Sequence, residues 1–237
     1  MRVFQISILS ILIGLISCSK PEGEGGKGII SGVISYDRHD HNNKLINTEI
    51  AKKEKVYIVY GENTSFDDDV DSYTDGSYHF DYLRKGDYQI IAFEDCNTCD
   101  SEKQEVVYEI SLDKNKSEAS NIDITLRKEV AVDDGTGVIS GRVWTQQYSG
   151  LTPIGNPYID ELQRVYLVYD TDSAHFDRVD TDANGYYSFS NLIQGNYTLF
   201  AYSGCAGCGV NLVPKEVTGS IASKGGELVL DITIEQH

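Results

Sequence analysis

The chain has 237 residues, of which 40% are hydrophobic, so it is long enough to bury a core in more than one domain. Its 37 acidic residues against 20 basic ones give a net charge of −17, which repels phosphate backbones and argues against a nucleic-acid partner. The five cysteines divide into one near the start and two pairs with identical spacing, a usage typical of an oxidising compartment.

The first element is a secretory signal. Arg2 precedes a mostly apolar run from Val3 to Ile16, which is shorter than the roughly 20 apolar residues of a transmembrane helix. The run ends in Leu15-Ile16-Ser17-Cys18, which resembles the bacterial lipobox. The resemblance implies that residues 1–17 are a lipoprotein signal peptide and that lipid on Cys18 anchors the mature chain to a membrane. The alternative is an ordinary signal peptide with an incidental cysteine.

Residues 18–27 follow as a flexible tether of glycines and acids. The segment Ser19 to Gly26 also looks like the lysine-plus-acid signals that send some Bacteroidetes lipoproteins to the outer face of the outer membrane. We therefore expect a lipid-anchored protein of the cell envelope, in the outer membrane, on its periplasmic or surface face.

The rest of the chain is a duplication with an offset of 109 residues. Ser31-Gly32 returns as Ser140-Gly141, Val56–Tyr60 as Val165–Tyr169, and the pair Cys96/Cys99 as Cys205/Cys208. A period this long marks tandem domains of about 100 residues rather than a solenoid. We expect domain 1 over residues 28–127, a short charged linker over 128–136 and domain 2 over 137–237.

Each repeat has the pattern of an all-β domain. Short runs rich in Val, Ile, Tyr and Phe are broken every 8 to 12 residues by Gly, Asp and Asn, which is strand spacing. The segment Thr181-Asp182-Ala183-Asn184-Gly185 predicts a hairpin turn, because Asp caps turns and Asn and Gly tolerate positive φ. Gly195 is expected to mark a second turn through its conformational freedom.

From Thr181 to Leu199 the sequence reads Thr-Asp-x-x-Gly-x-Tyr-x-Phe-x-x-Leu-x-x-Gly-x-Tyr-x-Leu, and the first repeat matches from Gly76 onward. This motif resembles the carboxypeptidase regulatory-like and collagen-adhesin B-type domains. The resemblance implies two tandem Ig-like, prealbumin-like β-sandwiches of about seven strands each. Domains of this kind act as stalks, spacers and adhesion modules. The closing strands carry Asp123 and Asp231 where an isopeptide bond would need Asn, so we expect no such crosslink.

The cysteine pairs admit three interpretations. Cys96/Cys99 and Cys205/Cys208 each follow a strand and fall in a loop, where local disulfides would stiffen a binding surface. Thiol redox exchange is the second, but Glu94, Asp95 and Asp100 would raise a thiol pKa. A four-sulfur metal site is the third, and it would require equivalent ends of two tandem domains to meet.

Two other groups of polar residues could hold metal. An acidic loop precedes the hairpin of each repeat. Such a loop is either solvated or binds calcium. The candidate calcium ligands are Asp67, Asp69, Asp71, Asp177, Asp180 and Asp182. His39 and His41 are the only histidine cluster, and a flexible polar loop is the simpler interpretation.

The sequence contains no nucleophile elbow and no phosphate-cradling loop. It therefore predicts a non-catalytic lipoprotein without a cofactor, which displays two β-sandwich modules for binding, adhesion or spacing. A protein or a glycan is the kind of ligand expected at the loop ends. The rival interpretation is an envelope thiol-redox or metal-handling protein that acts through the cysteine pairs.

Overall fold

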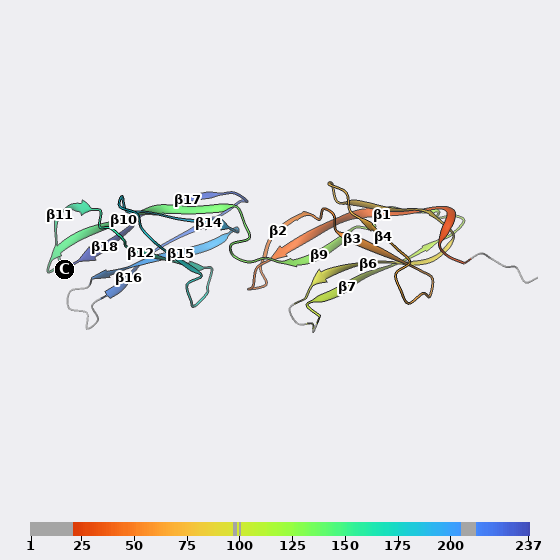
Figure 1. Ribbon diagram of the computed structural model, residues 1–237, viewed down its shortest axis with the longest axis horizontal. Helices are drawn as coiled ribbons and strands as arrows, with labels where there is room; N and C mark the ends of the chain where they lie inside the picture. Colours follow the sequence, from red (N-terminus) through yellow and green to blue (C-terminus); the bar gives the residue numbers. More distant parts are fainter. Residues whose placement is uncertain (1–20, 97–98, 100, 205–211) are drawn as a thin grey trace, which may run out of the picture. The chain divides into compact units, whose positions relative to one another are not determined.

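The computed structural model describes residues 21–96, 99, 101–204 and 212–237, and these residues form strands and no helix (Figure 1). None of the described residues belongs to a helix that could cross a membrane. The strands are β1 (Glu24–His39), β2 (Leu45–Ile50), β3 (Lys55–Tyr60), β4 (Asp68–Asp71), β5 (Ser77–Leu83), β6 (Gly86–Asp95), β7 (Lys103–Leu112), β8 (Glu118–Ala119), β9 (Ile124–Glu129), β10 (Gly137–Ser149), β11 (Thr152–Tyr158), β12 (Arg164–Tyr169), β13 (Asp177–Asp180), β14 (Tyr186–Leu192), β15 (Gly195–Gly204), β16 (Leu212–Ile221), β17 (Glu227–Val229) and β18 (Ile232–Gln236).

The strands make four sheets, two in each half of the chain. In the first half one sheet has the order β2-β1-β5, with β8 and β9 also paired to β1, and the other has the order β4-β3-β6-β7. The second half repeats this topology as β11-β10-β14, with β17 and β18 on β10, and as β13-β12-β15-β16. The predicted all-β fold with two sandwich-like halves is therefore confirmed.

Each half contains more strand segments than the seven or so that the resemblance implied. The closing strand is divided, into β8 and β9 in the first half and into β17 and β18 in the second. The break falls at Asp123 and Asp231, whose carboxylates accept the backbone N–H groups of Val33 and Arg142. A side chain thus takes the place of one rung of the backbone ladder.

By their contacts the residues group into two compact units. Unit 1 comprises Met1–Ile34, Ala51–Ala92 and Glu105–Ile124, and unit 2 comprises Ser35–Ile50, Phe93–Gln104 and Thr125–His237. Unit 1 buries Ile30, Ile34, Val56, Ile58, Tyr78, Phe80, Tyr88 and Ile90. Unit 2 buries Ile139, Val143, Val165, Leu167, Tyr169, Tyr187, Phe189, Tyr197 and Leu199. The alternating apolar residues of the repeat motif therefore supply the two cores.

Two segments that looked like solvated connections are partly built into the fold. Glu24–Lys27, inside the range expected as a flexible tether, belong to β1, and Gly23 accepts the Arg84 backbone N–H at 2.8 Å. Gly26 is required there because a Cβ would lie 2.0 Å from the Leu83 carbonyl oxygen. Glycine here allows close packing rather than flexibility.

The segment expected as a linker, residues 128–136, contains the end of β9 and two buried valines. Val130 and Val132 belong to the core of unit 2. Burial of their apolar side chains outweighs the flexibility that the neighbouring charges suggested.

The hairpin turns are built as their residues predict. Asp182 accepts backbone N–H groups of Asn184 and Tyr186, both at 2.8 Å, and Gly185 has a φ of 73°. The expected role of Gly195 is corrected: a Cβ there would lie 2.5 Å from the Tyr169 ring, so glycine is needed for space.

Candidate functional site

The Ser-Gly pair that opens each repeat has a structural role. A Cβ at Gly32 would lie 2.0 Å from the Ile122 carbonyl oxygen, and one at Gly141 would lie 1.8 Å from that of Leu230. Real side-chain carbons do not come that close to a backbone oxygen, so only glycine lets these strands approach.

The tyrosines at equivalent positions of the two repeats form hydrogen bonds between their side chains and the backbone. The hydroxyl of Tyr88 donates to the Arg84 carbonyl at 2.7 Å, and that of Tyr197 donates to the Ile193 carbonyl at 2.7 Å. This is the geometry of a tyrosine corner, in which a hydroxyl reaches the backbone a few residues upstream. Burial raises the pKa of the Tyr88 and Tyr197 hydroxyls, which stay protonated donors. The residues that repeat thus serve the fold.

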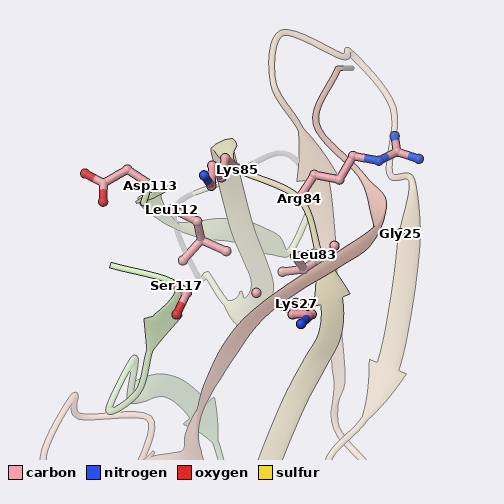
Figure 2. A pocket seen from close by; sticks show the side chains of 10 residues that line it. Gly25, Lys27, Leu83, Arg84, Lys85, Leu112, Asp113 and Ser117 are labelled. Atoms are coloured by element: carbon pink, nitrogen blue, oxygen red, sulfur yellow. The ribbon is translucent and has the colours of Figure 1, made fainter. Parts of the chain in front are cut away.

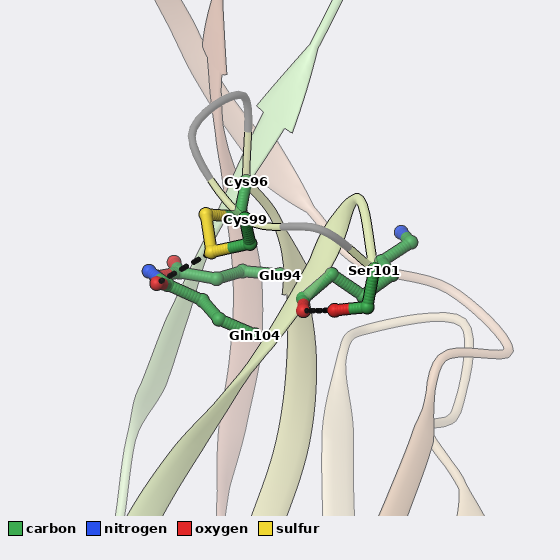
Figure 3. The surroundings of a disulfide bond; sticks show 6 residues. Glu94, Cys96, Cys99, Ser101 and Gln104 are labelled. Carbon is green, nitrogen blue, oxygen red and sulfur yellow. Dashed lines mark hydrogen bonds between the residues drawn. A yellow bond between two sulfur atoms is a disulfide. The ribbon is translucent and has the colours of Figure 1, made fainter.

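Figure 3 shows the first cysteine loop, where Cys96 and Cys99 form a disulfide. Cys96 is 9% exposed, and its backbone N–H donates to the Glu102 carbonyl at 3.0 Å. Cys99 Sγ lies 3.7 Å from Gln104 Oε1. This contact is not a hydrogen bond, because a disulfide sulfur carries no hydrogen to donate. The expected pair is therefore joined, whereas Cys18, Cys205 and Cys208 lie outside the described residues.

Two carboxylates tie this loop to β9. Glu94 accepts the Arg127 backbone N–H at 2.8 Å, and Asp95 accepts that of Glu129 at 2.9 Å. Burial acts to raise the pKa of Asp95, but hydrogen bonds from Lys103 and from the Glu129 backbone outweigh it and hold that pKa below its ordinary value. The acids beside the disulfide are thus occupied as structural acceptors.

The second repeat makes the same connection with a different side chain. Ser203 stands at the position equivalent to Glu94, and its hydroxyl oxygen accepts the Glu235 backbone N–H at 2.6 Å. Lys215 pairs with the Glu235 carboxylate at 2.6 Å. In each half, hydrogen bonds therefore hold the strand residue that precedes the cysteine loop against the closing strand.

The carboxylates considered for calcium are engaged separately. Asp67 accepts the Tyr60 backbone N–H at 2.7 Å, and Lys55 pairs with both Asp69 and Asp71. In the second half Asp177 accepts the Arg178 backbone N–H, Asp180 pairs with Arg164, and Asp182 caps the hairpin turn. Among the residues with described positions, no group of three or more histidine, cysteine or acidic side chains could hold a metal ion.

The two histidines considered as a cluster have different partners. His39 Nδ1 lies 3.0 Å from the Asp37 carbonyl oxygen, whereas His41 Nε2 lies 3.0 Å from Asp172 Oδ1. His41 belongs to the turn between β1 and β2, which is part of unit 2, as is Asp172. Burial acts to raise the pKa of Asp172, but hydrogen bonds from His41 and Asn42 lower it below its ordinary value.

Sequence reasoning did not anticipate a cavity of about 520 Å³ in unit 1, at the start of β1. Leu83 and Leu112 form part of its wall, and Lys27, Arg84 and Lys85 surround it against one carboxylate, Asp113. Figure 2 shows Lys85 beside Leu112 and Asp113, while the Arg84 guanidinium extends past Gly25 on the other side. Three basic residues and one acidic residue thus line this cavity in a chain whose net charge is −17.

The sequence contained one signal for this site. Arg84 and Lys85 stand where the second repeat has Ile193 and Gln194, and Lys27 stands where it has Thr136. A comparison of the two repeats for differences rather than similarities would have marked all three positions.

No family model matches the chain, and no curated protein matches it by sequence. Solved structures match with low similarity. The Bacillus anthracis TIE protein is 14% identical with a TM-score of 0.32, over 87% of this chain and 34% of that one. The minor pilin GBS52 of Streptococcus agalactiae is 15% identical with a TM-score of 0.31, over 89% and 96% of the two chains. A DUF3823 family protein from Parabacteroides merdae is 11% identical with a TM-score of 0.26, over 75% and 92%. The chain spans about a third of the length of the TIE protein.

Proposed function

We propose that this protein is a non-catalytic lipoprotein of the cell envelope, anchored in the outer membrane through lipid on Cys18. Its two β-sandwich modules are displayed for binding, adhesion or spacing. The loop ends beside Cys96/Cys99 and Cys205/Cys208 are the surfaces on which a protein or glycan ligand would bind.

One observation carries this proposal: the residues that the two repeats share are used to build the sandwiches. Gly32 and Gly141 allow close strand approach, and Tyr88 and Tyr197 fasten turns. Because the shared motif serves the fold, the sequences of the loops can differ between the two modules. This is typical of domains that present binding loops on a rigid scaffold. The Cys96–Cys99 disulfide supports an oxidising compartment outside the cytoplasm.

Anchoring is tested by expressing the full chain in a Gram-negative host as wild type and as Cys18→Ser. The wild type is expected in the detergent phase of a membrane extract. The variant is expected to lack lipid and to remain with uncleaved residues 1–17. Identical lipid content and processing of the two proteins would contradict the proposal.

The alternative, thiol-redox or metal-handling activity, needs cysteines that are readily reduced. The surroundings of Cys96 favour a structural disulfide, because it is 9% exposed and Glu94 and Asp95 are nearby acids that disfavour a thiolate. Titration against glutathione buffers separates the two functions. A potential below about −300 mV supports a structural disulfide, and one near −120 to −230 mV supports redox exchange.

A further inference from the structure

The cavity at the start of β1 lies close to the point where the described chain begins. Arg84 Nη1 donates to the Pro21 carbonyl at 3.2 Å, and Gly25 and Gly26 line the cavity. Pro21 is the third residue after Cys18, and three extended residues span about 11 Å at most. A lipid on Cys18 would therefore hold this end of unit 1 within about 11 Å of the membrane surface.

An exposed aromatic residue shares a surface with Lys27. Tyr82 is 72% exposed and lines a shallow depression together with Lys27, Ile29 and Asp81. Its φ is 58°, in the left-handed region that bulky side chains avoid. The equivalent residue of the second repeat is Asn191, with a φ of 61°, and asparagine tolerates this conformation. The first repeat therefore keeps a tyrosine at a strained position where it contributes nothing to a core.

Acidic residues also lie around this end of unit 1. Asp113 in the cavity wall accepts the backbone N–H groups of Asn115 and Lys116, and Asp81 lies 3.4 Å from His79. Glu24, Asp87 and Glu118 are further exposed acids of these strands, and the half-buried Glu22 packs against Gly86 beside Lys85, while Lys114 and Lys116 add cations in the turn beside Asp113. At physiological salt the Debye length is about 8 Å, so more distant acids of the chain contribute little.

The equivalent end of the second half shows what else could cover such a surface. In unit 2, Ile46 of β2 packs against the core cluster, and the same hairpin pairs Lys44 with Asp170. The corresponding hairpin of the second repeat, β10 and β11, has no charged residue from Thr145 to Tyr158. A second copy of this chain that docked through its β10–β11 hairpin would therefore bring no anionic group from residues 145–158 to Lys27, Arg84 and Lys85.

We propose that Lys27, Arg84, Lys85 and the exposed Tyr82 bind the headgroups of anionic phospholipids in the membrane that carries the Cys18 anchor. The phosphate groups neutralise the three cations, and Tyr82 lies at the level of the headgroups, where its ring meets apolar and its hydroxyl polar surroundings. The first sandwich then rests on the bilayer instead of being held away from it. This inference rests on the lipid anchor of the proposed function.

Because the lipid on Cys18 already holds the protein at the membrane, a weak contact between these residues and the headgroups is enough. Each cation close to an anionic surface is worth roughly fivefold in membrane partitioning, which is small for a free protein. A short connection to the membrane raises the effective concentration of headgroups to about the millimolar range, so the contact becomes intramolecular. The test therefore uses the lipidated protein.

The lipidated protein is placed in vesicles of phosphatidylcholine alone and in vesicles that also contain phosphatidylglycerol, and amide hydrogen exchange is followed by mass spectrometry. Amides of residues 81–86 and 112–117 are expected to exchange more slowly with phosphatidylglycerol by a factor of roughly five or more, since each of the three cations at an anionic surface contributes about that factor. The double variant Lys27→Gln/Lys85→Gln should lose this protection. The control variant Lys52→Gln/Lys53→Gln removes the same amount of charge from two exposed positions just before β3 begins. This variant should retain the protection.

Equal exchange in the two kinds of vesicle, or equal loss in the two double variants, would overturn the inference. So would equal protection by soluble glycerol phosphate with phosphatidylcholine vesicles, because the ligand would then be a free phosphate. Tyr82→Asn should weaken the protection while leaving the protein folded, and unchanged protection in this variant would remove Tyr82 from the surface. An intact mass without acyl groups would overturn the anchor and the inference together, whereas acyl groups without protection would overturn the inference alone.

Discussion

The hydroxyl of Tyr169 donates a hydrogen bond of 2.7 Å to Oδ2 of Asp40, which is fully buried. Oδ1 of the same carboxylate accepts the backbone N–H groups of Asn42 and Lys44 at 3.0 and 2.9 Å. A buried carboxylate is costly unless donors replace its water, and these three do so. Burial, followed by the hydrogen bond to Asp40, raises the pKa of Tyr169. The turn between β1 and β2 is thereby fixed within unit 2.

Tyr169→Phe is expected to lower the free energy of unfolding by about 1.5 to 3 kcal/mol, the usual cost of a lost hydrogen bond to a charged group. Urea denaturation followed by tyrosine and tryptophan fluorescence measures it. The matched control is Tyr60→Phe at the equivalent position of the first repeat, because the Tyr60 backbone N–H, and not its hydroxyl, is the donor to a described carboxylate, Asp67. Equal losses in the two variants would show that the Asp40 contact contributes nothing specific.

Gly32→Ala and Gly141→Ala should each destabilise the protein by about 1 to 3 kcal/mol, because the added methyl overlaps a carbonyl oxygen and forces strands apart. Ser140→Ala, one residue away, is the control and should change stability by less than about 0.5 kcal/mol. Thermal melting of the three variants compares them. Wild-type stability of Gly141→Ala would refute the close approach of β10 to Leu230.

Tyr82→Asn is expected to stabilise the fold by about 1 kcal/mol, because asparagine relieves the left-handed strain. Tyr73→Asn removes another exposed tyrosine whose φ is not positive, and it should bring no such gain. Chemical denaturation of both variants decides the point. A loss of stability on Tyr82→Asn would mean that the ring supports the fold.

Cys96→Ala/Cys99→Ala should reduce the free energy of unfolding by no more than about 2 kcal/mol, because the closed loop is short and restricts the unfolded chain little. Comparing the melting temperature of the variant with that of the wild type, both without reductant, measures the loss. A much larger loss of stability would mean that the disulfide stabilises the whole sandwich and not only the loop.

Acid should destabilise the protein partly through Asp95. The pKa of this carboxyl is lower in the fold than its ordinary value of 3.8, so its contribution is present above about pH 4 and is lost as the pH falls through the folded-state pKa. Asp95→Asn should therefore flatten the decline of stability below about pH 4. Asp133→Asn makes the same change of charge at an exposed position and is the matched control. Parallel slopes for Asp95→Asn and wild type would contradict the linkage.

Local patterns were enough to predict the strands and hairpins, because alternation in β14 and the Asp182 turn are encoded by adjacent residues. The tether over Glu24–Lys27 could not be predicted correctly, since Gly26 is required by the carbonyl of Leu83, which is distant in sequence. The Asp40 contact and the basic cavity were missed for the same reason. Each brings together side chains that are far apart in the sequence, and the sequence of one chain does not reveal which of them meet.

The central claim is a lipid-anchored, non-catalytic display protein, and intact mass spectrometry of the membrane-extracted wild type tests it most directly. The account predicts a chain that begins at Cys18, carries acyl groups on that residue and has its four remaining cysteines oxidised in two local pairs. A chain with a different first residue, without added acyl mass or with free thiols at those positions, would contradict it.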